Sequence, residues 1–277
     1  MLQRSPTYIL NLPSEDKVAN SLKKILPSKA AHHLIRWKNI LFSLLFYKAS
    51  RKWPNSIKKY IKKGVIKQLG EDYDISHFEP QYDPWDQRLC LVPDSDLFLA
   101  IKDEKAEIVT DLIDTFTEDG ILLKSGNELN ADLIVTATGL QIQLLGGMTV
   151  SKDGKPVDMS KLHCYRGVMF EDIPNFGIAI GYTNASWTLK CDLNCTYICR
   201  VINYLDKHNY STCTPKFDST KYDSEPLLDF NAGYVLRALD VLPKQGSKLP
   251  WKVYQNYILD LSTLKLSKIN DDVLKFE

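Results

Sequence analysis

Two predominantly apolar runs restrict the fold of this chain more than any other feature. The first covers residues 132–137 and the second covers residues 176–180, and neither alternates polar and apolar residues as a half-exposed strand does. Strands buried on both faces have this composition and belong to parallel sheets that helices cover, so the sequence predicts an α/β fold. Each run ends in a turn that contains a glycine, Gly139 or Gly181. Ligands of open α/β sheets bind beyond the carboxyl ends of strands, which makes both turns candidate ligand sites.

Residues 14–70 are predicted to be helical. Ser14 to Asp16 is a plausible N-cap, and Pro27 and Pro54 divide the region into two or three helices. The following residues, 71–97, are dense in aromatic residues and proline, which predicts an ordered loop.

Short β-branched or apolar runs separated by turn residues predict two antiparallel motifs. One is a meander at residues 107–110, 114–117 and 121–124, and the other is a hairpin at residues 149–150 and 156–157. A helix from about Trp187 to His208 follows the second apolar run, with Asn184 or Ser186 as its N-cap.

The charge distribution is uneven although the formal net charge is only +1. Residues 17–67 hold fourteen Lys and Arg residues and no Asp or Glu. The near-neutral total argues against a dedicated nucleic-acid-binding protein. Within this region, residues 31–49 have an apolar stripe with a basic flank, and two interpretations remain open. The stripe packs on the protein itself, or it lies on a membrane surface that carries anionic lipid.

Cysteine and histidine spacing predicts no metal site. None of the six cysteines forms a CxxC pair, and the five histidines show no metal-ligand spacing. Cys191, Cys195 and Cys199 share one helix face, where core packing is the preferred interpretation and a soft-metal site the alternative. The chain begins without the apolar segment of a secretion signal, which favours reduced thiols in a cytoplasm. Its longest apolar stretch, residues 40–47, is too short to cross a bilayer.

One absence conflicts with a complete nucleotide-binding enzyme. The sequence contains no GxGxxG motif and no two glycines separated by a single residue. A flavin or nicotinamide domain carries such a phosphate-binding turn near its first strand. The chain also begins inside what resembles a strand end at Leu2. Both observations lead us to expect further sequence upstream of Met1.

Four segments together resemble the flavin-dependent Baeyer–Villiger monooxygenases, especially their bacterial ethionamide-activating branch. The segments are Met1 to Tyr8, Pro84 to Pro93, Asp132 to Leu140 and Gly181 to Lys190. The resemblance continues through Gln245 to Lys248 and covers essentially the whole chain. It implies a partial flavoprotein fold of two dinucleotide-binding domains, with incomplete parallel sheets, an antiparallel meander and a helical insert. Residues 1–139 would be the C-terminal part of the NADPH-binding domain, with the insert at residues 14–70. Residues 140–277 would be the C-terminal part of the FAD-binding domain.

The resemblance also implies cofactors, a reaction and site residues. Enzymes of this family reduce FAD with NADPH, trap O2 as a C4a-peroxyflavin, and insert one oxygen atom into a ketone or oxidise a thioamide or sulfide. Arg4 matches their catalytic arginine, whose permanent charge suits a peroxyflavin anion. Gln3 stands where many relatives place a basic residue near the NADPH 2′-phosphate, so the preference for NADPH over NADH is open. The other implied cofactor-binding residues are Thr138, Gly139, Asn184, Trp187 and Thr188.

The missing glycine-rich turns lead to a further expectation. Without them the isolated chain is expected to bind FAD weakly or not at all, to expose unpaired strand edges, and to need an N-terminal half as partner. The alternative is a non-catalytic remnant or a basic peripheral-membrane module that uses residues 17–67. A different two-nucleotide flavoprotein, such as a disulfide reductase, is disfavoured because the chain has no CxxC.

Overall fold

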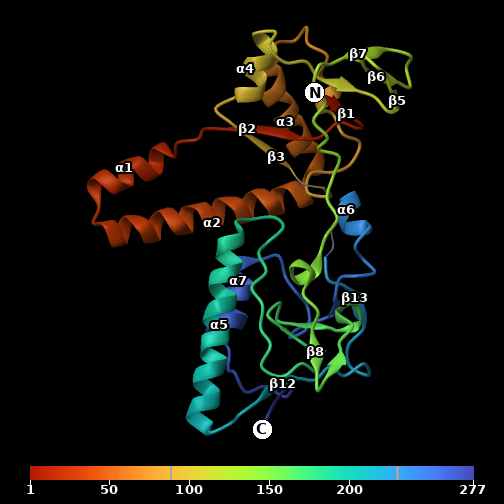
Figure 1. Ribbon diagram of the computed structural model, residues 1–277. Coiled ribbons are helices and arrows are strands. Elements are labelled where there is room, and N and C mark those ends of the chain that lie inside the picture. The colour runs from red at the N-terminus through yellow and green to blue at the C-terminus, as the bar shows by residue number, and fades with distance from the viewer. Residues whose placement is uncertain (88, 229–230) are drawn as a thin grey trace. The chain divides into compact units, whose positions relative to one another are not determined.

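The computed structural model describes residues 1–87, 89–228 and 231–277, and the chain divides into two compact units, Met1–Gly139 and Leu140–Glu277 (Figure 1). Arg88, which belongs to the Pro84 to Pro93 segment, lies outside the described residues. None of the helices in the described ranges has the length and apolar character needed to cross a membrane.

Three helices confirm the helical prediction for residues 14–70. They are α1 (Lys17–Ile25), α2 (Ser28–Lys52) and α3 (Pro54–Leu69), and α1 and α2 run antiparallel (Figure 1). Asp16 caps α1, because its carboxylate accepts a hydrogen bond from the Ala19 amide at 3.0 Å. Pro54 is the first residue of α3, where the amide that proline lacks would have no helical partner.

Two parallel strand pairs order the start of the first unit. β1 (Leu2–Gln3) pairs with β4 (Val109–Thr110), and β2 (Ile9–Leu12) pairs with β3 (Cys90–Pro93). The prediction of a loop for residues 71–97 is therefore wrong for its last third, which contains β3 and the first residues of α4 (Asp96–Lys102). A short 3₁₀ helix, η1 (Ile75–Phe78), lies earlier in the same segment. β3 is a strand because β2, about eighty residues earlier, supplies its hydrogen-bond partners. A strand of only four residues is too short to show a clear alternation of polar and apolar side chains in the sequence.

The hydrophobic core of this unit joins the strands to the helices. Its members come from β2, α3, η1, α4 and the approach to β4, and they are Ile9, Val65, Phe78, Phe98, Ile101 and Ile108. Burying these side chains against one another stabilises the unit and fixes the position of β1 and β4 beside it.

The antiparallel meander is confirmed, but it is displaced along the chain. Its strands are β5 (Ile113–Phe116), β6 (Gly120–Leu123) and β7 (Glu128–Asn130), in that order. The predicted first strand at residues 107–110 instead contributes β4, which pairs with β1 in parallel. The prediction of a strand at residues 107–110 was thus correct in part, but its pairing partner, β1, lies about a hundred residues earlier in the chain.

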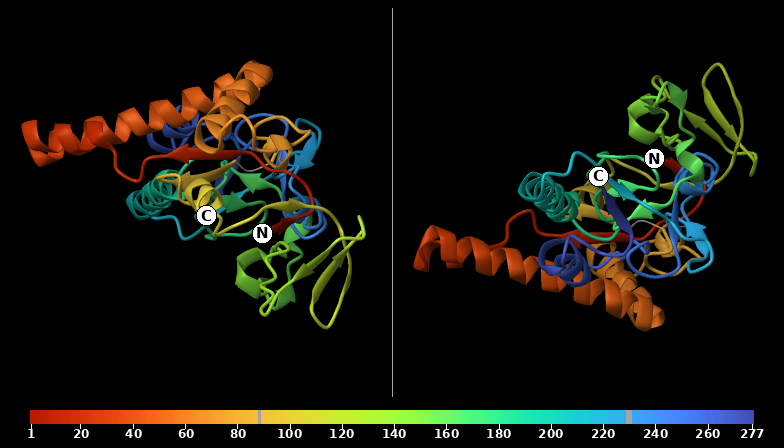
Figure 2. Two further views of the ribbon diagram at one scale, coloured as in Figure 1. Left: turned by 90° about the horizontal axis from the view of Figure 1, so that it is seen from above. Right: turned by 90° about the horizontal axis from the view of Figure 1, so that it is seen from below.

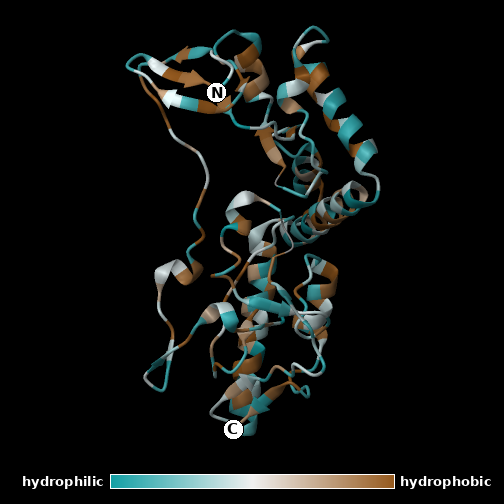
Figure 3. Ribbon diagram, turned by 90° about the vertical axis from the view of Figure 1, so that its right-hand side faces the viewer, coloured by the Kyte–Doolittle hydropathy of each residue, from teal (hydrophilic) through white to brown (hydrophobic). Residues whose placement is uncertain are grey.

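The predicted buried strand at residues 132–137 is wrong in this structure. Leu133 and Val135 are 81% and 80% exposed, and the segment is extended without strand pairing among the described residues (Figure 3). A strand is stable only when neighbouring backbone satisfies its N–H and C=O groups. No described segment of the first unit lies beside these residues, so their apolar side chains remain in contact with solvent.

The second unit contains four short antiparallel pairs. The predicted hairpin is confirmed as β8 (Ser151–Lys152) and β9 (Lys155–Pro156), joined by Asp153 and Gly154 at positive φ. The other pairs are β10 (Cys164–Tyr165) with β11 (Met169–Phe170), β12 (Cys213–Pro215) with β15 (Leu274–Phe276), and β13 (Ser224–Pro226) with β14 (Lys244–Gly246). The short helical segments are η2 (Leu144–Gly147), η3 (Met159–Lys161), α6 (Gly233–Leu236), α7 (Tyr257–Asp260) and η4 (Leu261–Leu266).

The predicted strand at residues 176–180 is also wrong. Only Gly177 forms a bridge, with Met169, and the remaining residues of the run have no strand partner among the described residues. The helix that follows is confirmed at its predicted bounds as α5 (Trp187–His208), one continuous helix seen nearly along its axis in Figure 2. Both runs are rich in apolar residues, but this composition alone does not show whether a second strand pairs with them along their length.

A buried guanidinium ties the C-terminal segment to β10. The Arg166 side chain is 9% exposed and donates to the Tyr165 hydroxyl at 2.7 Å and the Ser267 hydroxyl at 2.9 Å, and it pairs with Asp271 at 3.0 Å. Tyr165 in turn donates to the Asp271 carboxylate at 2.6 Å. This network orders a tail that the sequence presented as irregular.

Core packing of the three α5 cysteines is wrong for two of them. Cys195 and Cys199 are exposed, and Cys191 is partly buried. Within the described ranges, no group of three or more His, Cys, Asp or Glu side chains is placed to hold a metal ion. The prediction that they pack as small apolar residues followed from the general tendency of free cysteine to be buried, but their face of α5 is turned largely to solvent.

Candidate functional site

The segment between Gly181 and the first turn of α5 presents an aromatic ring to solvent. Trp187 is 54% exposed, and the inner side of its ring lies against Gly181. A Cβ atom at position 181 would lie 2.2 Å from Trp187 Cγ, so only glycine allows this approach. The contact leaves the indole fixed on one side and accessible on the other, an arrangement suited to packing against a planar ligand.

The N-terminus of α5 adds a polar element next to this ring. Ser186 is the N-cap residue, but its side chain does not accept a hydrogen bond from the helix amides. Its hydroxyl instead lies 2.8 Å from that of Thr188. Uncapped first-turn amides and the positive end of the helix dipole favour an electron-rich or anionic group at this position.

Gln255 anchors the loop before α5 by two hydrogen bonds. The amide of Thr183 donates to the Gln255 side-chain oxygen at 2.9 Å, and the buried Asn184 side chain donates to the Gln255 carbonyl at 2.9 Å. Asn184 therefore acts within the protein in this structure. Its side-chain nitrogen is engaged by Gln255 and does not face an open surface.

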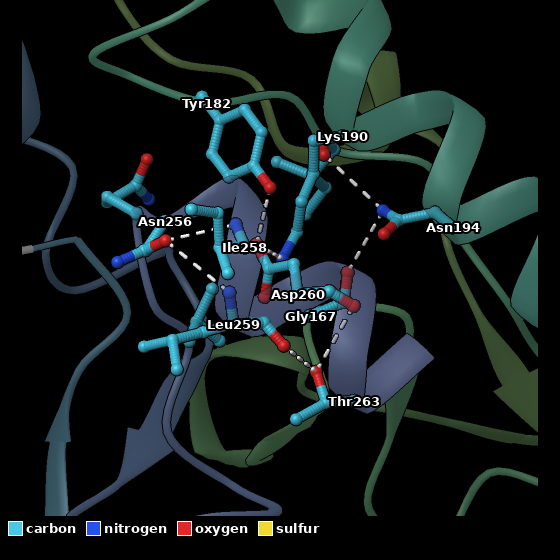
Figure 4. Close-up of polar contacts among 12 residues, drawn as sticks. Gly167, Tyr182, Lys190, Asn194, Asn256, Ile258, Leu259, Asp260 and Thr263 are labelled. Atoms are coloured by element: carbon cyan, nitrogen blue, oxygen red, sulfur yellow. Dashed lines mark hydrogen bonds and ion pairs between the residues drawn. The ribbon is translucent and has the colours of Figure 1, made fainter. Parts of the chain in front are cut away.

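A buried ion pair lies one helical turn further along α5. The Lys190 ammonium is 2.6 Å from an Asp260 carboxylate oxygen, and the two side chains are 3% and 6% exposed. The Tyr182 hydroxyl donates to the same carboxylate at 2.6 Å, as Figure 4 shows. The contact of Lys190 with Asp260 has ion-pair distance without the angular geometry of a directed hydrogen bond.

Burial controls the electrostatics of this cluster. Desolvation raises the pKa of the Asp260 carboxyl, while Lys190 and the Tyr182 hydroxyl oppose the rise. Desolvation and the neighbouring Asp260 carboxylate raise the pKa of Tyr182 well above its ordinary value. Tyr182 therefore stays a neutral hydrogen-bond donor at physiological pH.

The other predicted site residues lie in the first unit. Gln3 in β1 donates to the His77 carbonyl at 2.7 Å and to the Thr110 hydroxyl at 2.8 Å. Arg4 follows it and is exposed. Thr138 and Gly139 are exposed at the end of the same unit, with Gly139 at φ +123°. The structure thus brings Asn184, Trp187 and Thr188 into one segment of the second unit.

The sequence analysis missed Gln255 and Asp260, and it gave Lys190 no role. Lys190 entered the sequence analysis only as the last residue of the Gly181 to Lys190 segment. A lysine on a predicted helix is expected to be solvent-exposed. Asp260 lies seventy residues later in a stretch without a motif. The single available signal was the Asn256 cap of α7, whose side chain accepts from the Ile258 amide at 3.0 Å and so places Asp260 at the end of that helix.

The described residues fit one side of a flavin site. Trp187 offers a ring face, and the start of α5 offers uncapped amides for the electron-rich edge of an isoalloxazine. The pyrophosphate of a dinucleotide needs a glycine-rich turn, and this sequence has none.

Comparisons with known proteins identify relatives of this chain. No family model matches the chain. The chain is 48% identical over 277 residues to the FAD-containing monooxygenase EthA of Mycobacterium tuberculosis, covering 100% of this chain and 57% of that protein. It is 47% identical over 278 residues to the probable FAD-binding monooxygenase AlmA of Acinetobacter baylyi, covering 56% of it. The chain therefore spans a little over half the length of these relatives.

Two solved structures share the fold. An oxidised steroid monooxygenase bound to NADP matches with a TM-score of 0.57 and 16% identity, over 78% of this chain and 49% of that one. OTEMO in complex with FAD and NADP matches with a TM-score of 0.57 and 14% identity, over 78% of this chain and 48% of that one. At this level of identity the likeness concerns the fold alone.

Proposed function

We infer that this chain, which is homologous over all of its 277 residues to FAD-containing monooxygenases, forms the part of such an enzyme that completes its flavin and nicotinamide sites. Identity of 48% over all 277 residues of this chain and the exposed Trp187 ring that packs on Gly181 carry this inference. The division into compact units at Gly139 supports assigning residues 1–139 to an NADPH-binding domain, with residues 14–70 as its helical insert. Residues 140–277 then belong to the FAD-binding domain.

The proposed reaction transfers one atom of O2 to a ketone carbon–carbon bond or to a sulfur atom. The second oxygen atom leaves as water, and NADPH supplies the two electrons. FAD, when bound, would supply the transfer of those electrons to oxygen. Arg4 would stabilise negative charge on the reacting oxygen through its guanidinium group. Trp187 and Thr188 would limit and orient the flavin ring from the side of α5.

Gln3 bears on cofactor choice. Its side-chain nitrogen donates to His77 and Thr110, so the residue is engaged within β1, β4 and η1. A neutral, internally bonded amide offers a 2′-phosphate no charge. We propose that residue 3 contributes little to selecting NADPH, and that any discrimination comes from other positions.

Complementation tests the proposed function. The full chain is co-expressed with the N-terminal part of an AlmA-type relative that it does not cover, and FAD content and NADPH oxidation with a ketone and a thioamide are measured. Substrate-dependent NADPH oxidation and a bound yellow flavin are expected only when both parts are present. Arg4→Ala should lower the oxidation rate by about 10²-fold or more, whereas Lys102→Ala, an exposed cation of the same unit, should not. A complemented complex that holds FAD but turns over equally well with Arg4→Ala contradicts the role of Arg4.

A second candidate function rests on the exposed face of α2. Leu34, Trp37, Leu41 and Leu45 lie at helical spacing and are 52%, 40%, 43% and 63% exposed. Four cations of α2 and α3 are neutralised by acids outside these helices, as in the pairs of Lys58 with Asp83 and Lys62 with Glu79, but Lys48, Lys52 and Lys59 are exposed without a carboxylate partner among the described residues. An anionic membrane surface fits such a face. Co-sedimentation with phosphatidylglycerol vesicles that weakens with salt supports this function, and equal absence of binding at low and high salt contradicts it.

A further inference from the structure

A single carboxylate joins the two stretches of chain that make the Trp187–Gly181 contact. Tyr182 follows Gly181 directly, and Lys190 lies one helical turn after Trp187 on α5. Both side chains end on the same oxygen of Asp260, at 2.6 Å each (Figure 4). Asp260 thus binds both the loop that contains Gly181, through Tyr182, and the first turns of α5 that contain Trp187, through Lys190.

Other bonds around the cluster constrain the same two stretches. The buried Asn194 side chain of α5 donates to the Ile180 carbonyl at 3.3 Å and to the Gly167 carbonyl at 3.2 Å. Ile180 directly precedes Gly181, so α5 is also tied to the glycine side without Asp260. Asp260 itself is fixed at the end of α7, which the Asn256 side chain caps.

We propose that Lys190 and Asp260 are positioning residues whose buried ion pair sets the orientation of Trp187 at the start of α5. The identity of the ligand that Trp187 would contact rests on the proposed flavin function, but the orientation itself does not.

Energetics favour a positioning role over a simple contribution to stability. Removing two charges from water costs several kcal/mol for each ion, and apolar side chains of similar volume are often as stable or more so. Removing one partner alone leaves a buried charge unpaired, which is strongly unfavourable. An ion pair that is 3% and 6% exposed, with one tyrosine hydroxyl as its additional partner, is therefore an inefficient way to stabilise a core. It does fix a distance, because the Lys190 ammonium must stay within ion-pair reach of the Asp260 carboxylate, which holds the start of α5 close to the end of α7.

Fluorine NMR reads the orientation of Trp187 without any cofactor. The full chain is labelled with 5-fluorotryptophan, and Trp187→Phe identifies the Trp187 resonance among the five tryptophans. Asp260→Asn and Lys190→Met are each expected to shift or broaden this resonance and to raise acrylamide quenching of Trp187. The resonance of the fully buried Trp251 reports whether the second unit is still folded.

Two matched pairs serve as controls. Lys216 and Asp172 form an exposed ion pair in the same unit, and Lys216→Met should leave the Trp187 resonance unchanged. Asp271→Asn breaks the partly buried pair with Arg166, and it should lower stability without moving the Trp187 resonance in the folded protein. The double variant Lys190→Met with Asp260→Leu should fold but retain the altered Trp187 signal, because apolar side chains fill the volume of the two residues without restoring the ion pair.

The outcomes separate this inference from the proposed function. Unchanged Trp187 signals in folded Asp260→Asn and Lys190→Met proteins overturn the positioning role. If both single variants lose the Trp251 signal, the double variant Lys190→Met with Asp260→Leu decides, since it removes the ion pair without leaving a buried charge unpaired, and an unmoved Trp187 resonance in that variant overturns the role as well. In the complemented complex, FAD affinity should fall by about tenfold or more in Asp260→Asn, because misplacing a binding group by about 1 Å has effects of this order. A responsive Trp187 resonance together with no FAD binding in any complex contradicts the proposed function and leaves the positioning role intact.

Discussion

Replacing Gly181 with alanine tests the packing of the candidate site most directly. The new Cβ would lie 2.2 and 2.3 Å from two ring carbons of Trp187 and 2.7 Å from its Cα. Ordinary carbon–carbon contacts begin near about 3.5 Å, so the ring must withdraw by about 1 Å. Rotation of the side chain cannot remove the clash, because the Cα atom belongs to the backbone of α5. Gly181 is not among the glycines at positive φ, so the effect is steric and not conformational.

The expected magnitude follows from overpacking. Inserting a methyl group into a closed contact costs about 1–3 kcal/mol, which we expect as the loss in the free energy of unfolding of the second unit. Gly64→Ala is the matched control, since its Cβ meets nothing within 4 Å inside α3. Alanine in a helix interior is better than glycine by about 0.5–1 kcal/mol, so the control should stabilise the first unit.

Urea unfolding measures both variants. Far-UV circular dichroism follows the loss of helix in the whole chain. The assigned fluorine resonances of Trp187 and Trp251 follow the unfolding of the second unit. Gly181→Ala is expected to lower the free energy of unfolding, and Gly64→Ala is expected to raise it. A Gly181→Ala protein as stable as the unsubstituted chain, with an unmoved Trp187 signal, refutes the packing argument.

Three further predictions follow from burial and charge. Burial raises the pKa of the Cys164 and Cys213 thiols to about 12, so about 10⁻⁴ of each is thiolate at pH 8 and neither should react with Ellman's reagent in the folded protein. Rapid labelling should be confined to the more accessible thiols, and modification of all six before unfolding contradicts this. Trp251→Ala should lower the free energy of unfolding by about 3–5 kcal/mol, because the side chain is fully buried between His163, Tyr165 and Phe217; a loss below about 1 kcal/mol in urea unfolding disagrees. A hydrogen bond from Lys38 and one from the Ala19 amide hold the pKa of Asp16 below 3.8. The α1 cap is therefore present above pH 3.8 and is lost as the pH falls below it, and Asp16→Asn should remove that acid-dependent loss of helical circular dichroism.

Much of the secondary structure was predictable because its signals are local. Pro27, Pro54 and the Asp16 cap divide the helical region, and α5 begins and ends at the predicted residues. The glycine turn at Asp153 and Gly154 fixes the β8–β9 hairpin in the same way. The resemblance to flavin-dependent monooxygenases, read from four short segments, is confirmed by 48% identity along the whole chain.

Pairing and burial were decided by the tertiary structure. Residues 132–137 and 176–180 have the composition of buried strands, but a strand needs a continuous partner backbone. Among the described residues the first run has no strand partner, and the second has a single bridge, between Gly177 and Met169. Lys190 is a solvated helix residue by sequence, and only the distant Asp260 makes it a buried cation. Sequence by itself therefore determined the local elements and the likeness to FAD-containing monooxygenases, because caps, turns and motifs act over a few residues. The partners of each strand and each buried charge depended on contacts between residues far apart in the chain, which composition and spacing do not encode.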